Sequence, residues 1–172
     1  MTRLRTAAGA LALALAATGC GVQSTGVLDG GEPASGLTND LRIYFVRGSG
    51  LQGVTRPGVP ITRPEGVIKL LMAEPTAAEQ ERGLANLVEL GSYRTSSSGS
   101  GDRITLHAPG GYFNGERDRL PNGQLVCSLA RAQSFLHRDD PGGAIRPDDV
   151  RVSLDDGTRT YGPYQCSQFL TG

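Results

Sequence analysis

The start of the chain restricts which part of it can fold. Two positive charges, Arg3 and Arg5, precede an apolar run over 7–17, and small residues follow that run. The run has about ten residues, whereas a membrane-spanning helix needs about 20. A charged start, a short apolar middle and a small-residue exit are typical of a secretory signal peptide. We therefore predict a signal peptide over 1–19 and expect the folded domain to begin after it.

The apolar run leads directly to Cys20. Residues 15–20 read LAATGC, which resembles a lipobox. By that resemblance a diacylglyceryl group is attached to the Cys20 thiol, and the chain is cut before this residue. One acyl chain anchors a protein only marginally, so a bacterial lipoprotein is expected to carry a second acyl signal. The alternative is an ordinary signal peptide with a cysteine near its cleavage site by chance.

The charge balance excludes one class of partner. The chain has 17 basic and 17 acidic residues, and cleavage would remove Arg3 and Arg5, which leaves 15 basic against 17 acidic residues and a net charge of −2. Nucleic-acid binding depends on a basic surface, so we expect no nucleic acid partner. The same balance leaves no polybasic patch that would help a lipid to hold the membrane.

Two cysteines, Cys127 and Cys166, remain if Cys20 carries lipid. In an exported protein such a pair usually forms a disulfide. Closing a loop of about 40 residues should stabilise the fold by about 4 kcal/mol in the chain-entropy model. The alternative is two free, buried thiols.

Residues 20–38 are predicted to be a flexible tether. They are rich in Gly, Ser, Thr, Asp, Glu and Pro, and their scattered apolar residues have no period. A flexible chain of about 18 residues spans roughly 20–25 Å, which lifts a domain clear of the lipid headgroups. Residues 39–172 then have a length that suits one folded domain.

The domain is predicted to begin with a β-hairpin. Aromatic and β-branched residues favour a strand over 41–47 with both faces covered, followed by a turn at 48–50 and a short second strand over 53–57. Residues 48–53 also match G-x-G-x-x-G, the phosphate-binding pattern of dinucleotide sites. Such a site needs a helix directly after it, and the sequence there cannot start one, so we interpret this match as the hairpin turn.

Three helices are predicted. A proline and an acidic residue open the first, over 64–73, and a capping box at 76–79 opens a short second helix that ends at Gly83. The longest helix covers about 123–137, with Cys127 in its first two turns. Apolar spacing gives the first and the last helix one core face each, formed by Val67, Leu70 and Leu71 and by Leu125, Leu129, Ala132 and Leu136.

The remaining strands are predicted in the second half. Alternation favours strands over 103–107 and 150–154, and the turn signal at 156–157 brings the chain back as a last strand over 159–161. The Ser- and Gly-rich residues 96–101 are predicted to be a flexible loop or hairpin tip. The fold class is therefore α+β: a small mixed or antiparallel sheet packed by two or three helices, after a signal peptide and a flexible linker.

The order of these pieces resembles a GerMN domain. The resemblance covers about residues 41–160, and its motifs lie at 43–46, 55–57, 70–76, 124–129 and 150–157. Two positions depart from the family pattern, because Glu74 replaces a glycine and Cys127 replaces a tyrosine. The resemblance implies an α+β domain similar to ring-building modules and to those of LpqB-type bacterial lipoproteins. Such domains act through protein partners in envelope signalling or sporulation, and no catalytic residues come with them.

The sequence supports no catalytic or metal site. His107 and His137 are predicted at a strand end and a helix end, and Ser128 lies in a helix without the Gly-x-Ser-x-Gly turn of a nucleophile. Zinc needs three or four ligands, and the acidic pairs after residue 138 lack the spacing of a calcium loop. We therefore predict no catalytic residue, no metal and no cofactor. A hydrolase would need a paired acid and base that the sequence does not reveal.

The predicted function is a lipid-anchored, extracytoplasmic protein-interaction domain at the cell membrane, not an enzyme. Its partner is expected to be another protein of the cell envelope. A candidate surface lies at 110–115, although core packing explains the aromatic residues Tyr93, Tyr112, Phe113, Tyr161 and Tyr164 as well. The alternative is a small-molecule or cell-wall-glycan binder that uses 108–120, and a deep pocket with convergent polar groups would favour it.

Overall fold

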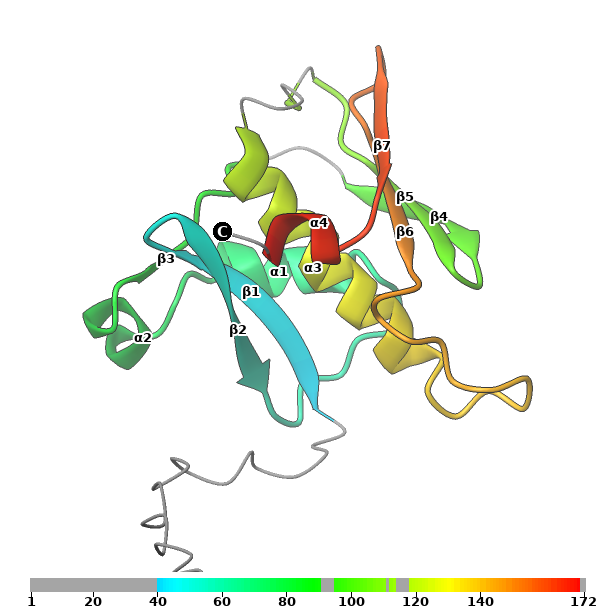
Figure 1. Ribbon diagram of the computed structural model, residues 1–172, viewed down its shortest axis with the longest axis horizontal. Coiled ribbons are helices and arrows are strands. Elements are labelled where there is room, and N and C mark those ends of the chain that lie inside the picture. The colour runs from blue at the N-terminus through cyan, green and yellow to red at the C-terminus, as the bar shows by residue number, and fades with distance from the viewer. Residues whose placement is uncertain (1–39, 91–94, 111, 114–117, 171–172) are drawn as a thin grey trace, which may run out of the picture. The chain divides into compact units, whose positions relative to one another are not determined.

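The computed structural model describes residues 40–90, 95–110, 112–113 and 118–170 (Figure 1). The predicted signal peptide, Cys20 and the tether lie outside these residues. In the described part of the chain, seven strands form two sheets and four helices accompany them. The predicted α+β class is confirmed, with the strands divided between two sheets instead of gathered in one.

The first sheet is built on a hairpin. β1 (Leu41–Arg47) and β2 (Gly50–Arg56) pair antiparallel along their whole length, and the two-residue β3 (Leu84–Ala85) lies on the other side of β1. Both faces of β1 are covered, as predicted, because its buried residues are Leu41, Ile43, Tyr44, Phe45 and Val46. The G-x-G-x-x-G match forms the turn and the start of β2, which confirms that it is a hairpin.

Two short helices follow the hairpin. α1 (Gly66–Met72) buries Val67, Ile68 and Leu71, and the predicted core residue Leu70 is partly buried against the same core. α2 (Ala77–Glu81) begins with the predicted capping box, in which Thr76 Oγ1 accepts a hydrogen bond from the Glu79 N–H and Glu79 Oε2 accepts one from the Thr76 N–H. Gly83 follows its end with a φ of 79°, a conformation that favours glycine.

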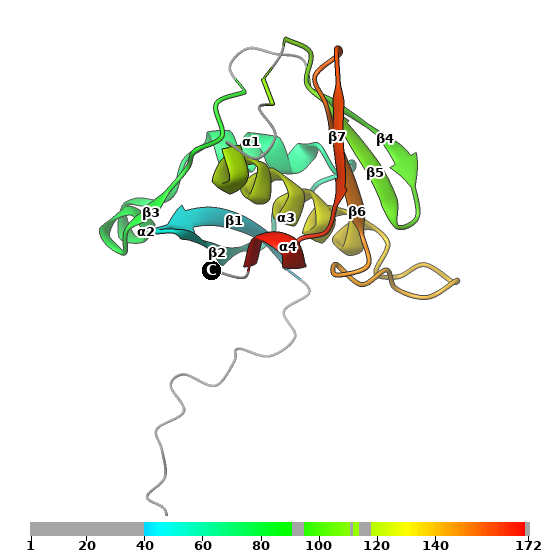
Figure 2. The ribbon, with the colours of Figure 1, turned by 45° about the horizontal axis from the view of Figure 1, so that its top comes forward.

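The helix α3 (Arg119–Leu136) packs against both sheets (Figure 2). It begins at Arg119 instead of Gly123, which places Cys127 in its third turn and Pro121 in its first, where a missing N–H costs nothing. Every residue from Asn122 to Ala130 is buried. The prediction of a single core face was therefore wrong, because α3 is covered on all sides from Asn122 to Ala130.

The second sheet has the order β4-β5-β6-β7. Its strands are β4 (Ser96–Ser100), β5 (Arg103–His107), β6 (Arg151–Asp155) and β7 (Thr160–Tyr164). β5 and β6 are parallel and α3 connects them, whereas the other neighbours are antiparallel. Its apolar residues belong to the same core as α3, and they are Ile104, Leu106, Val152 and Leu154. The alternate positions of these strands carry mainly polar side chains on the outer face.

Residues 96–101 were predicted to be a flexible loop or hairpin tip, which is wrong for Ser96–Ser100 because they form strand β4, whereas Gly101 does lie at the hairpin tip. The turn of this hairpin lies at 101–102, and every residue of β4 pairs with β5. Serine and glycine have little preference for strands, so the pairing partner decides the structure here. Gly99 has a φ of 118°, and a Cβ at this position would lie 2.3 Å from the carbonyl oxygen of Arg103.

Candidate functional site

The predicted disulfide is confirmed. Cys127 of α3 bonds to Cys166, which directly precedes α4 (Ser167–Leu170), and their Sγ atoms lie 2.01 Å apart. Both residues are buried. The bridge ties the end of the chain to the central helix. The sequence has three cysteines, and the bridge uses Cys127 and Cys166. No further cysteine is therefore available in this sequence to pair with Cys20.

Two buried polar side chains of α3 satisfy the backbone of β1. Ser128 Oγ accepts a hydrogen bond from the Tyr44 N–H at 3.0 Å, and Gln124 Nε2 donates one to the Tyr44 carbonyl at 3.1 Å. Gln124 Oε1 also accepts a hydrogen bond from the Leu87 N–H at 2.8 Å. A buried backbone group without a partner costs about 1–3 kcal/mol. Ser128 and Gln124 thus serve the fold at the position where β1 lacks a full-length neighbour strand.

The described aromatic residues pack against one another. Phe113 is 1% exposed, and its ring meets those of Tyr112 and Tyr161 edge to face, at centroid distances of 5.1 and 6.4 Å. Tyr112 Oη accepts a hydrogen bond from the Glu89 N–H, and burial raises the pKa of this phenol. Tyr93 and much of the surface predicted at 110–115 lie outside the described residues. The small-molecule or glycan alternative at 108–120 therefore stays a prediction.

An ion pair between Arg56 and Glu79 lies beside β2. Arg56 donates to both carboxylate oxygens of Glu79, at 2.6 and 2.7 Å, and its guanidinium lies 5.6 Å from the centroid of the Phe45 ring. These hydrogen bonds lower the pKa of Glu79 to about 2. The pair lies next to a hollow of about 340 Å³ between β2 and α2. Because Glu79 also caps α2, the pair has a clear structural role.

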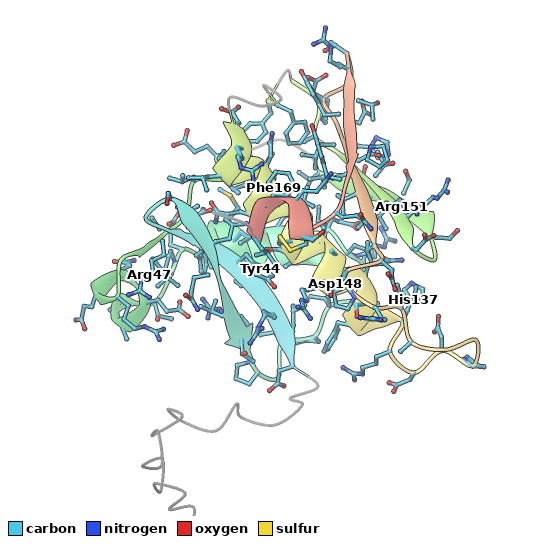
Figure 3. All side chains as sticks on the ribbon, in the orientation of Figure 1. Tyr44, Arg47, His137, Asp148, Arg151 and Phe169 are labelled. Carbon is cyan, nitrogen blue, oxygen red and sulfur yellow. A yellow bond between two sulfur atoms is a disulfide. The ribbon has the colours of Figure 1, made fainter. Side chains whose placement is uncertain are left out.

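Both histidines lie where the sequence predicts them. His137 follows the last residue of α3 (Figure 3), and its Nδ1 lies 2.6 Å from Asp140 Oδ2. His107 is the last residue of β5. Its Nε2 lies 2.7 Å from Ser98 Oγ, and its Nδ1 lies 2.7 Å from Asp155 Oδ2. The hydrogen bond with His107 is the main reason that the pKa of Asp155 lies below its ordinary value.

The Ser98–His107–Asp155 chain has the connectivity of a serine hydrolase triad, and the sequence analysis missed it. Asp155 lies directly opposite His107 in the parallel pair, and Ser98 lies diagonally from His107 across the hairpin. Sheet register alone brings such neighbours into contact. The side chains of His107 and Asp155 are 37% and 25% exposed, so water competes for these hydrogen bonds. A nucleophile also needs placed oxyanion donors and an enclosed site, which the outer face of a sheet does not supply by itself.

A groove of about 450 Å³ lies beside β4, and we call it the β4–α3 groove. One wall is β4, and the others are the end of α3 and the segment that precedes α1. Its lining residues are Thr62, Arg63, Pro64, Ser97, Ser98, Gly99, Ser100, Ile104, Gln133, Leu136 and His137. Ser97 Oγ donates a hydrogen bond to Glu65 Oε2, and Gln133 Nε2 donates one to the Gly101 carbonyl at 2.7 Å. These two bonds connect the walls.

The described residues offer no metal centre and no membrane span. None of their His, Cys, Asp and Glu side chains gather in a group of three or more that could hold a metal ion, and none of their helices combines the length and the apolarity needed to span a bilayer. No family model, no curated protein and no solved structure matches this chain. The GerMN resemblance therefore stays a prediction from the sequence motifs.

Proposed function

We propose that this chain is a lipid-anchored, extracytoplasmic interaction module of the bacterial cell envelope. The observation that supports this proposal best is the buried bridge between Cys127 and Cys166. Disulfides persist in proteins that fold outside the reducing cytosol. The bridge also leaves Cys20 free to carry lipid, at the end of a segment with the features of a signal peptide.

The surface of the domain supports binding as the activity. The β4–α3 groove is open along an edge strand, and a strand edge is a common place for protein contacts. The GerMN resemblance implies the same mode of action, through protein partners. The module would work by holding this surface close to the membrane, within the reach of a tether that spans roughly 20–25 Å.

Detergent phase partitioning tests the anchor. The full chain is produced in a bacterium that processes lipoproteins, as wild type and with Cys20→Ser, and Ser24→Ala serves as a matched control in the predicted tether. We expect the wild type and the control in the detergent phase, and the mature Cys20→Ser protein in the aqueous phase, because the acyl chains supply the membrane affinity. Mass spectrometry that finds an unmodified Cys20 at the mature N-terminus would contradict the proposal.

The Ser98–His107–Asp155 chain supports a second candidate function, the hydrolysis of an ester. In that reaction Ser98 Oγ attacks the carbonyl carbon while His107 Nε2 takes its proton, and the alcohol leaves with that proton. Water then attacks the acyl-serine by the same route and releases the acid. We place this function second because His107 and Asp155 are partly exposed to water.

Labelling with a fluorophosphonate probe decides on the second candidate. The wild type is compared with Ser98→Ala and with Ser96→Ala, a control on the same strand and the same face. Label that is lost only in Ser98→Ala would establish Ser98 as a nucleophile. A wild-type protein without label would limit the chain of hydrogen bonds to a role in the sheet.

A further inference from the structure

We propose that the β4–α3 groove binds an extended segment of a partner protein, which adds to β4 as a further strand. This inference rests on the proposed interaction function and names its site. The segment is expected to carry an apolar side chain next to an acidic one. Three features of the groove lead to this proposal: the open edge of β4, the apolar part of the opposite wall, and the charge at its rim.

The first feature is the open edge of β4. In the described part of the chain, β4 has a strand neighbour on one side only, which is β5. A two-residue turn joins the two strands, so Ser100 and Arg103 form the hydrogen-bonded pair next to it. The backbone groups then alternate, and those of Ser97 and Gly99 point away from β5. Only an extended chain offers donors and acceptors at the matching spacing.

The second feature is the wall that faces this edge. It contains the end of α3, with Leu136, and the segment with Pro64, while Ile104 also lines the groove. A peptide between an edge strand and a helix receives backbone hydrogen bonds from one wall and side-chain contacts from the other. A volume of about 450 Å³ lies within the range of roughly 300–1,000 Å³ that is usual for ligand sites.

The walls are also held in place without a ligand. Ser97 bonds to Glu65, which precedes α1, and Gln133 of α3 bonds to the turn after β4. Both bonds connect segments that are far apart in the sequence. A groove whose walls are already fixed loses little conformational entropy when a peptide binds, and this preorganisation favours affinity.

The third feature is the charge at the rim. The side chain of Arg63 is 79% exposed, and its nearest acidic contact is Glu65 at 3.9 Å, whose Oε2 already accepts a hydrogen bond from Ser97. None of the described residues that line the groove is acidic. Charge complementarity therefore calls for an acidic partner residue. A second copy of this chain would place like charges at the shared edge, so we commit to a different protein.

A random peptide library displayed on phage tests the site, with the full chain held in detergent micelles. Enriched peptides are measured against the wild type and against Arg63→Glu and Leu136→Asp, with Arg82→Glu as a matched control outside the groove. We expect the two groove variants to bind about tenfold more weakly and the control to bind as the wild type does. Circular dichroism checks that each variant is folded.

Hydrogen exchange of the backbone amides supplies a readout that depends on strand addition. A peptide that pairs with β4 should slow exchange at Ser97 and Gly99, whose N–H groups point away from β5. Protection elsewhere, equal binding by all variants, or a library without enriched peptides would each overturn the inference. The inference would also be overturned if the free wild-type chain formed dimers and Arg63→Glu altered the dimer fraction, because the occupant of the groove would then be a second copy of this chain.

The proposal of a lipid anchor and the proposal of a peptide-binding groove can be refuted independently of each other. Phase partitioning of the Cys20 variants does not depend on any groove residue. If the anchored protein cross-links to an envelope protein equally well with Arg63→Glu and Leu136→Asp, the groove is the wrong site while the interaction function stands.

Discussion

The ion pair between Arg56 and Glu79 allows a quantitative test of the fold. Its side chains are only 18% and 8% exposed, and two short hydrogen bonds join them. The change Glu79→Gln removes the charge but keeps a side-chain oxygen that can accept from the Thr76 N–H, the bond that caps α2. The variant therefore separates the ion pair from the cap.

The pKa of Glu79 gives the expected size of the effect. The pKa falls from 4.5 to about 2, chiefly because of the hydrogen bonds from Arg56. Each pKa unit corresponds to about 1.4 kcal/mol, so the ionised carboxylate stabilises the fold by about 3 kcal/mol at pH 7. The folded-state pKa lies below the unfolded one, so this stability is complete above the unfolded pKa and is lost as the pH falls towards 2. At pH 3 about 1 kcal/mol should remain.

Urea unfolding followed by circular dichroism measures this difference, since the chain has no tryptophan for fluorescence. The wild type is compared with Glu79→Gln at pH 7 and at pH 3, and Glu81→Gln is the matched control because Glu81 is exposed on the same helix. We expect the gap in free energy of unfolding to shrink from about 3 to about 1 kcal/mol. A gap that is equal at both pH values, or an equal loss in Glu81→Gln, would refute the reasoning.

Three further predictions concern α3. Gln124→Leu should lower the free energy of unfolding in urea by about 1–3 kcal/mol, because the buried carbonyl of Tyr44 and the partly buried N–H of Leu87 lose their hydrogen bonds to Gln124. Gly123→Ala should raise helix propensity yet destabilise by about 1–3 kcal/mol in the same assay, because its Cβ would lie 2.9 Å from Phe169. Reduction of the disulfide should cost about 4 kcal/mol, measured with and without reductant, since it frees a loop with a sequence separation of 39.

Local patterns predicted several elements correctly. The capping box of α2, the strand β1 with both faces covered, and the hairpin turn at 48–49 all depend on residues within a few positions of one another. Such signals act through the backbone nearby, so no knowledge of the rest of the fold is needed. The disulfide was predictable for a different reason, because cysteine number and a signal-like N-terminus together leave one natural pair.

The candidate site was not predictable in the same way. Ser98, His107 and Asp155 lie on three strands, and only their register places them in one chain of hydrogen bonds. The β4–α3 groove depends on β4, whose serines and glycine favour a loop when read alone. The buried polar residue Gln124 likewise has its reason in β1, far away in the sequence.

Sequence alone determined the α+β class and the bridge between Cys127 and Cys166, since each follows from composition or from short-range pattern. Tertiary structure alone decided that α3 is buried on all sides from Asn122 to Ala130 and that a serine-rich segment becomes an edge strand. The physical reason is that burial and strand pairing are properties of neighbours in space. Free energy from those neighbours exceeds the small local preferences that a sequence pattern records.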